Sequence, residues 1–202
     1  MTTFIGLDLS LRATGVAVWR GDRQEGRIFR RTIRTVPPVD DAHGWAAASR
    51  HRRIAAEVLS YVEAGDTLAI IEQRINYSGG GQHGTTELDL AGLRAVVVAY
   101  LAGRRVPVAS IYPVQVKAYL TGSGAATKVD MMAAAQLVLR QYPTDDNQAD
   151  ALGLLAMGLD RWGQPLAPLP AKNRGVLDRI TWPIFTPAWT LASVGDQRED
   201  TA

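Results

Sequence analysis

The chain contains no cysteine among its 202 residues. Disulfide bonds and thiolate metal sites are therefore excluded, and a reducing compartment is the natural setting. The sequence also lacks an apolar run long enough to span a membrane, and its N-terminus lacks a basic segment followed by a long apolar one. We therefore expect a cytoplasmic protein.

The composition is that of a packed globule. Apolar residues make up 47% of the chain and charged residues 21%, a balance that argues against disorder. The net charge is only +2, but arginines gather between residues 20 and 53. Such a stretch can bind phosphates through counterion release, or it can be an ordinary solvated surface. Charge alone does not distinguish the two.

The apolar pattern predicts an α/β fold. Residues 3–9, 14–20 and 26–34 are expected to be strands, and their short connections predict an antiparallel meander. The pattern then predicts further strands at 67–72 and 106–111, and helices at 42–63, 85–102, 128–140 and 146–161, with a short helix starting at 114. This order fits a ribonuclease-H-like domain: a mixed five-stranded sheet with an antiparallel front and parallel additions, flanked by helices.

The last part of the chain has a different character. After Trp162 the regular pattern gives way to a proline-rich segment. We expect residues 1–162 to form the ribonuclease-H-like domain and residues 163–202 to form an extended, partly ordered C-terminal tail, anchored by aromatic side chains at Trp182, Phe185 and Trp189.

Three carboxylates lie at the edges of apolar elements. Asp8 closes the first strand, Glu72 closes a later one, and Asp150 begins an apolar helix. Carboxylates in such places are costly unless positive charge lies against them, and hard divalent cations take oxygen ligands. Asn147 shares the helix face of Asp150, and Asp146 is a possible substitute, although we expect it to cap the helix. One such acid alone is usually a turn residue, but the three together predict a shared metal site.

Four segments resemble the RuvC family of Holliday-junction endonucleases. Residues 5–15 resemble the family's opening strand and turn with its first catalytic aspartate, and residues 71–73 match its Ile-Glu-Gln motif. Residues 115–128 resemble its Gln-Val-Lys stretch, glycine-containing turn and second lysine, and residues 147–152 resemble its closing Asp-x-x-Asp-Ala-Leu motif. The match runs from residue 3 to about 162 in the family's order, which makes four individually weak motifs specific together.

The resemblance implies a structure-selective endodeoxyribonuclease. It would use two Mg²⁺ ions per active site, with Mn²⁺ as a substitute, to cut branched DNA such as a four-way junction. By the same resemblance, Asp8, Glu72, Asn147 and Asp150 would hold the metal ions. Lys117 and Lys128 would bind DNA phosphate near the scissile bond, where one can stabilise charge in the transition state; without the resemblance they are ordinary solvated lysines.

The sequence departs from the family at two positions that bear on the site. Asn147 stands where the family often has Asp or His, so it can offer an oxygen ligand but neither a base nor a charge. Ile75 stands where the family has an aromatic residue that stacks on bases. Tyr77 can take that role, since stacking on one base is worth roughly 1–3 kcal/mol, or it can simply cover apolar surface. We also expect Arg12 and Arg74 to contact DNA.

The helix at 85–102 corresponds to the family's twofold interface, which implies a homodimer. Its apolar side chains occupy more than one side of the helix, namely Leu88, Leu90, Leu93, Val96, Val97 and Tyr100. Alternatively, this helix is simply central to the core of the monomer.

Three other functions share features with this sequence. A ribonuclease-H-like nuclease acting on flaps or RNA–DNA hybrids has the same fold, and a non-catalytic junction-binding protein would explain Asn147. A sugar-kinase-like ATPase has a similar opening but needs a second glycine-rich phosphate loop, which the sequence lacks. Compact relatives with tails are common in bacteriophages, so the resemblance also suggests a phage origin.

Overall fold

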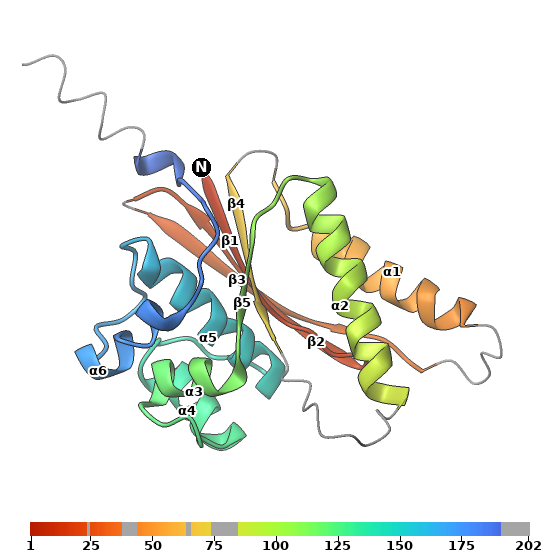
Figure 1. The fold of residues 1–202 in the computed structure, drawn as a ribbon. Helices are drawn as coiled ribbons and strands as arrows, with labels where there is room; N and C mark the ends of the chain where they lie inside the picture. The colour runs from red at the N-terminus through yellow and green to blue at the C-terminus, as the bar shows by residue number, and fades with distance from the viewer. Residues whose placement is uncertain (24, 38–43, 64–65, 74–84, 191–202) are drawn as a thin grey trace, which may run out of the picture.

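The computed structural model describes residues 1–23, 25–37, 44–63, 66–73 and 85–190. Its centre is a five-stranded sheet in the order β3-β2-β1-β4-β5 (Figure 1). The strands are β1 (Thr2–Asp8), β2 (Ala13–Gly21), β3 (Gly26–Arg34), β4 (Thr67–Glu72) and β5 (Val108–Ile111). Strands β1, β2 and β3 pair antiparallel, whereas β4 and β5 are added parallel to β1. The predicted mixed sheet with its antiparallel front is therefore confirmed.

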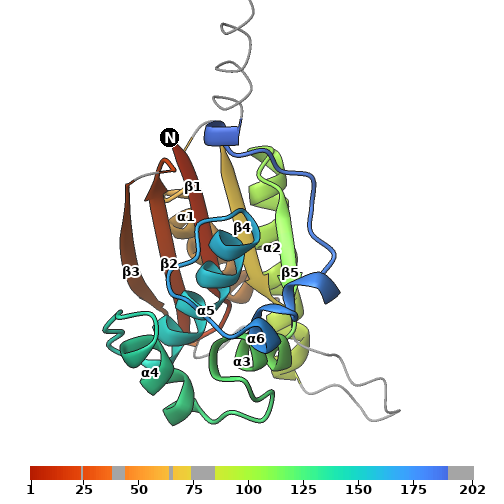
Figure 2. The ribbon, with the colours of Figure 1, turned by 90° about the vertical axis from the view of Figure 1, so that its left-hand side faces the viewer.

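Helices cover both faces of this sheet (Figure 2). On one face α1 (Trp45–Leu59) and α2 (Thr85–Gly103) enclose a core that includes Ile5 and Leu7 of β1. On the other face α5 (Asp146–Arg161) packs on a second core that includes Phe4. The helices α3 (Pro113–Thr121) and α4 (Lys128–Leu137) lie beside α5. Successive strand residues point to opposite faces. The even-numbered residues of β1 therefore face α5, and the odd-numbered residues face α1 and α2.

Two glycines let α5 lie directly on the sheet. A side chain at Gly6 of β1 would collide with the carbonyl oxygen of Ala151, and one at Gly15 of β2 would collide with the backbone of Asn147. Only glycine tolerates so close an approach of two backbones. The N-terminal end of α5 is thereby fixed at the edge of the sheet where β1 ends.

Two helices are shorter than expected. The helix predicted over 42–63 spans Trp45–Leu59, and residues 42 and 43 lie outside the described residues. The helix predicted over 128–140 ends at Leu137, because the chain then turns so that Leu139 enters the core and Arg140 adopts a left-handed φ of 54°. In both cases the helical spacing of apolar residues continues past the last helical residue, so the C-terminal end of the helix was predicted too late.

The tail packs against the domain as far as it is described. It contains two short elements that the sequence pattern did not predict, α6 (Ala171–Arg174) and the 3₁₀ helix η1 (Leu177–Arg179). The rings of Phe185 and Trp189 lie 5.5 and 5.9 Å from that of Phe4 in β1. The backbone N–H of Ala188 donates to the hydroxyl of Thr2 at 3.2 Å. The tail thus completes the core on the α5 face. In the part of the chain that is described, no helix has both the length and the apolar character needed to cross a membrane.

Candidate active site

Asp8 and Glu72 end neighbouring parallel strands. The register pairs Leu7 of β1 with Ile71 of β4, so the next residue of each strand, Asp8 or Glu72, stands at the same edge. Ile70 of β4 packs in the core on the α5 face, and alternation places Glu72 on that face too. Asp8 has the parity of Phe4 and is only 6% exposed. The two carboxylates therefore belong to one face and one edge of the sheet.

The N-terminal turns of α5 bring two further oxygen donors to this edge. Asp8 pairs with Gly15 across the β1–β2 ladder, and Gly15 lies against the backbone of Asn147. Asp150 follows one turn later on the same helix. Asn147 and Asp150 are both half-buried. The strands β1 and β4 and the helix α5, which is distant from them in sequence, thus place polar residues near the end of β1.

The charge environment of Lys128 shows that the acids lie near one another. The pKa of Lys128 is raised, first by its hydrogen bond to Asp146 and by the charge of that carboxylate, and further by the charges of Asp150 and Asp8. One ammonium group therefore lies in the field of two carboxylates of α5, Asp146 and Asp150, and of Asp8 at the end of β1. Such a field favours any cation that enters it.

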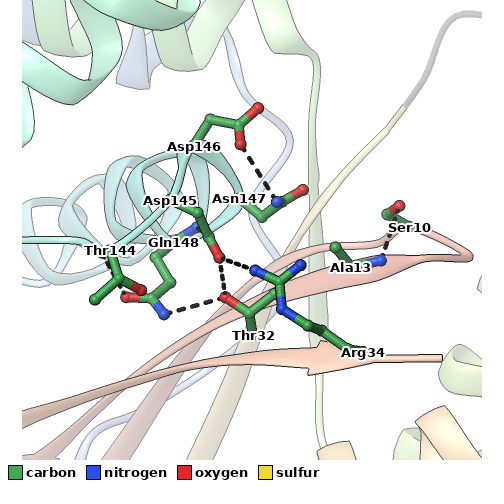
Figure 3. Close-up of polar contacts among 9 residues, drawn as sticks. All are labelled: Ser10, Ala13, Thr32, Arg34, Thr144, Asp145, Asp146, Asn147 and Gln148. Atoms are coloured by element: carbon green, nitrogen blue, oxygen red, sulfur yellow. Dashed lines mark hydrogen bonds and ion pairs between the residues drawn. The ribbon is translucent and has the colours of Figure 1, made fainter.

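The helix α5 is capped by Asp145 and not, as expected, by Asp146. The Asp145 carboxylate accepts a hydrogen bond from the backbone N–H of Gln148 at 3.0 Å. Its other oxygen accepts from the Thr32 hydroxyl at 2.7 Å and from the Arg34 guanidinium at 2.9 Å (Figure 3). The cap thus ties the start of α5 to β3. Because Asp145 and Asp146 are adjacent and both suit an N-cap, the sequence did not decide which of the two caps the helix.

Asp146 instead forms an ion pair with Lys128 of α4. This bond lowers the pKa of Asp146. The side-chain nitrogen of Asn147 also points toward Asp146, at 3.4 Å (Figure 3), so the Asn147 oxygen is directed elsewhere. No described residue donates to that oxygen, which is the atom of Asn147 that can bind a metal ion.

The turn between β1 and β2 is held in place at the same edge. The Thr14 hydroxyl donates to the carbonyl of Ser10 at 2.7 Å and accepts from its N–H at 3.1 Å. Arg50 of α1 donates to the carbonyl of Leu11, and burial lowers the pKa of its guanidinium. These contacts position Arg12, which is exposed. Neither Thr14 nor Arg50 was singled out from the sequence. Arg50 acts through a contact with a distant segment, and the Thr14 hydroxyl closes a local turn onto Ser10.

The comparison with known families identifies this arrangement. The model of the crossover junction endodeoxyribonuclease RuvC matches residues 4–157. This chain belongs to the RuvC family. A RuvC of Prochlorococcus marinus (strain MIT 9313) is 30% identical over 158 residues, which cover 76% of this chain and 96% of that protein. The RuvC of Syntrophomonas wolfei is 30% identical over 153 residues, covering 74% and 84%.

Solved structures agree with this assignment. The RuvC of Thermus thermophilus in complex with a Holliday junction substrate has a TM-score of 0.60 and 22% identity, over 84% of this chain and all of that one. The yeast mitochondrial Holliday junction resolvase has a TM-score of 0.53 and 11% identity, over 88% and 81%. At these identities the likeness concerns the fold. The family match makes the chain an endodeoxyribonuclease of the RuvC type.

The acids at this edge fit a hard divalent cation in donor type. All the donors are oxygens, which Mg²⁺ prefers, and they come from β1, β4 and α5 at one edge. Among the described residues, however, no three His, Asp or Glu side chains gather closely enough to hold one ion.

The remaining predicted DNA contacts divide into two groups. Arg74 and Tyr77 lie outside the described residues. Lys117 is half-buried on α3, the helix that follows the end of β5. Since β5 is parallel to β1, this helix starts at the same edge as Asp8. Lys117 does not take part in the ion pair that holds Lys128.

The helix α2 has apolar side chains on a buried side and on a partly exposed side. Leu93, Val97 and Leu101 are fully buried against the sheet, so the helix is central to the core of the chain. Leu88 is 63% exposed, and the other apolar residues named above are half-buried. The core therefore accounts for one side of α2, and apolar surface remains on another.

Proposed function

We propose that this RuvC-type endodeoxyribonuclease hydrolyses phosphodiester bonds in Holliday junctions with the help of Mg²⁺. The observation that carries the proposal is the meeting of Asp8, Glu72 and Asp150 at one edge of the sheet. It is supported by the Thermus thermophilus relative, which was solved with a Holliday junction. The cytoplasm of a bacterial cell is the implied place of action, whether the gene belongs to the cell or to a phage.

The acids would hold two Mg²⁺ ions, and Mn²⁺ would substitute. Asp8, Glu72, Asp150 and the Asn147 oxygen would hold these ions. When bound, the ions supply an activated water and stabilise the leaving oxygen of the phosphodiester. Asn147 adds no charge, so this chain neutralises its metal ions less than a relative with an acid there.

Lys128 has two partners in this proposal. Without metal and DNA, its ammonium offsets part of the charge of the clustered acids. With DNA bound, it would leave Asp146 and contact a phosphate near the scissile bond. Its raised pKa keeps it charged throughout the neutral range, so protonation does not limit the exchange. Lys117 and Arg12 would bind neighbouring phosphates and fix the register of the backbone.

A homodimer would supply the second cut. The apolar surface that α2 leaves uncovered, including Leu88, is a suitable interface. A twofold dimer presents two equivalent sites, as the near-symmetry of a four-way junction requires. Arg74 and Tyr77 would contact bases or phosphates near the junction centre.

Cleavage of defined substrates tests the proposal. The wild-type protein and Glu72→Gln are incubated with a synthetic four-way junction, a flap, a linear duplex and an RNA–DNA hybrid, each with Mg²⁺, Mn²⁺ or chelator. We expect metal-dependent cleavage of the junction above all other substrates, and no cleavage by Glu72→Gln. Preferred cleavage of the flap or the hybrid would indicate a ribonuclease-H-like nuclease with a substrate other than the four-way junction. Tight junction binding without cleavage in either metal would indicate a non-catalytic binding protein.

A further inference from the structure

A buried ion pair fixes the tail onto the domain. The Asp160 side chain, at the C-terminal end of α5, is fully buried. Both its oxygens accept hydrogen bonds from Arg174 of α6, at 2.6 and 2.9 Å, and one also accepts from the Tyr119 hydroxyl at 3.1 Å. Burial, and then the Asp160 charge, raise the pKa of Tyr119, so its hydroxyl remains a donor. A buried carboxylate without such partners would be strongly unfavourable, so α6 has one position on the domain.

Asn173 sets the distance between α6 and α3. Its side-chain nitrogen donates to the carbonyl of Tyr119 at 3.0 Å. Its side-chain oxygen lies 3.4 Å from where a Cβ of Gly122 would stand, and Gly122 has a left-handed φ of 83°. Glycine at the end of α3 therefore permits both the turn and the close approach of the tail. The contact places the neighbours of Asn173 beside α3.

This docking forms an open cavity of about 390 Å³ between α3 and the tail. Ala118 and Gly122 line it on one side, and Lys172 and Arg179 line it from the tail. Its lining contains two cationic side chains and no acid. Asp178 is exposed but is not part of the lining. The cavity is therefore positively charged.

Neither cation has a structural task. Lys172 and Arg179 are exposed, and within the described residues neither side chain makes a hydrogen bond or ion pair. The neighbouring Arg174, in contrast, donates hydrogen bonds to the buried carboxylate of Asp160. One basic residue thus anchors the tail, while two others are presented to solvent in a fixed position.

We propose that this cavity binds a phosphate of the DNA backbone in an arm of the junction, away from the scissile bond. The inference rests on the proposed function. It follows from the place of the cavity, since α3 also carries Lys117, which would grip DNA at the active-site edge. Duplex DNA carries one negative charge per roughly 1.7 Å of its axis, so cations of the tail beside the far end of α3 can meet further phosphates. The site is built from residues 171–179, beyond the segment 4–157 that matches the family.

Salt-dependent binding tests the site in the full-length chain. The dissociation constant for a four-way junction is measured in chelator over a series of salt concentrations for the wild type and Lys172→Gln/Arg179→Gln. We expect about 3- to 10-fold weaker binding near 100 mM salt and a slope of log Kd against log salt that is smaller by about 1–2. The rate of cleavage at saturating DNA should not change, because neither residue touches the reacting groups.

Two further variants make the test specific. Arg104→Gln/Arg105→Gln removes two exposed charges from the connection between α2 and β5, at the opposite edge of the sheet, and should leave the slope as in the wild type. Lys172→Arg/Arg179→Lys keeps both charges and should bind as the wild type does. All variants should unfold at the wild-type temperature, because the substituted side chains are exposed.

The outcomes separate the two proposals. If the wild type binds and cuts the junction but Lys172→Gln/Arg179→Gln keeps its Kd and slope, the site is wrong and the function stands. An equal loss in the opposite-edge variant also overturns the site, because the effect is then one of net charge. If inorganic phosphate binds there while DNA affinity is unchanged, the cavity takes free anions and not DNA. A wild type that neither binds nor cuts the junction overturns both.

Discussion

Lys128, the first residue of α4, donates a hydrogen bond to Asp146, the first residue of α5. The bond raises the pKa of the lysine and lowers that of the aspartate. It places a positive charge within the field of Asp150 and Asp8. Lys128 therefore neutralises part of the negative charge that these carboxylates bring together.

Replacing Asp146 by Asn separates its two possible roles. If Asp146 only holds Lys128, Asp146→Asn frees the lysine, so junction affinity should rise severalfold and cleavage should stay within a few-fold of the wild type. The pKa of Lys128 should fall toward its ordinary value, which NMR of the lysine side chain measures. Loss of cleavage by about 10²-fold or more would show that Asp146 is itself a metal ligand, since a metal ion contributes several kcal/mol to the transition state.

Restoring an acid at position 147 should tighten metal binding. Asn147→Asp adds a charged ligand, and the affinity of oxygen sites grows with their charge. We expect half-maximal cleavage at a roughly 3- to 10-fold lower Mg²⁺ concentration, and the reverse shift for Asn147→Ala. Glu25→Gln, an exposed change in the turn between β2 and β3, serves as control. Equal Mg²⁺ dependence in all variants would remove Asn147 from the site.

The tail should contribute to the stability of the whole domain. Trp189 stacks on Phe4 with ring planes 21° apart and meets Trp19 edge-on. Removing this side chain leaves a cavity against a fully buried ring, so Trp189→Ala should cost about 2–4 kcal/mol and lower Tm by about 5–10 °C. Calorimetry measures both. Thr186→Ala, an exposed change nearby, should leave Tm unaltered. Full stability in a chain ending at residue 162 would mean that the tail is dispensable.

His51 should make the fold sensitive to mild acid. Burial lowers its pKa, although Asp89 opposes this effect with a smaller contribution. A lowered pKa means that the unfolded chain binds the proton more readily. Stability is then full above the unfolded value of about 6.5 and falls as the pH drops below it. Unfolding of the wild type and of His51→Gln between pH 5 and 8 checks this, with a flatter profile expected for the variant. Parallel profiles would contradict it.

The sequence revealed the parts of the site that strand patterns mark. Asp8 and Glu72 each close an apolar run, and parallel strands bring such ends together, so their meeting follows from periodicity and topology. Asn147 and Asp150 were predicted differently, from their i, i+3 spacing on one helix and from the resemblance to the family's closing motif. The helix cap was assigned one residue too late, because Asp145 and Asp146 are equally good caps on paper and only the contacts with β3 decide between them.

Contacts between segments that are distant in the chain could not be predicted from the sequence. The pair of Lys128 and Asp146 links the starts of two helices, and no local pattern specifies it. The prolines after Trp162 indicate irregular structure, and they concealed the short helix that carries Arg174. The aromatic residues of the tail indicated that it packs on the domain, but the sequence does not show that Asp160, an acid within an apolar helix, is the partner of Arg174.

Direct measurement of metal binding tests the central claim, that Asp8, Glu72 and Asp150 form one metal site. Mn²⁺ bound per chain is counted by electron paramagnetic resonance, with an uncleavable junction present, in the wild type and in Asp8→Asn, Glu72→Gln and Asp150→Asn. We predict about two ions per chain in the wild type and loss of binding in each variant. Unchanged Mn²⁺ binding in all three variants would contradict the claim.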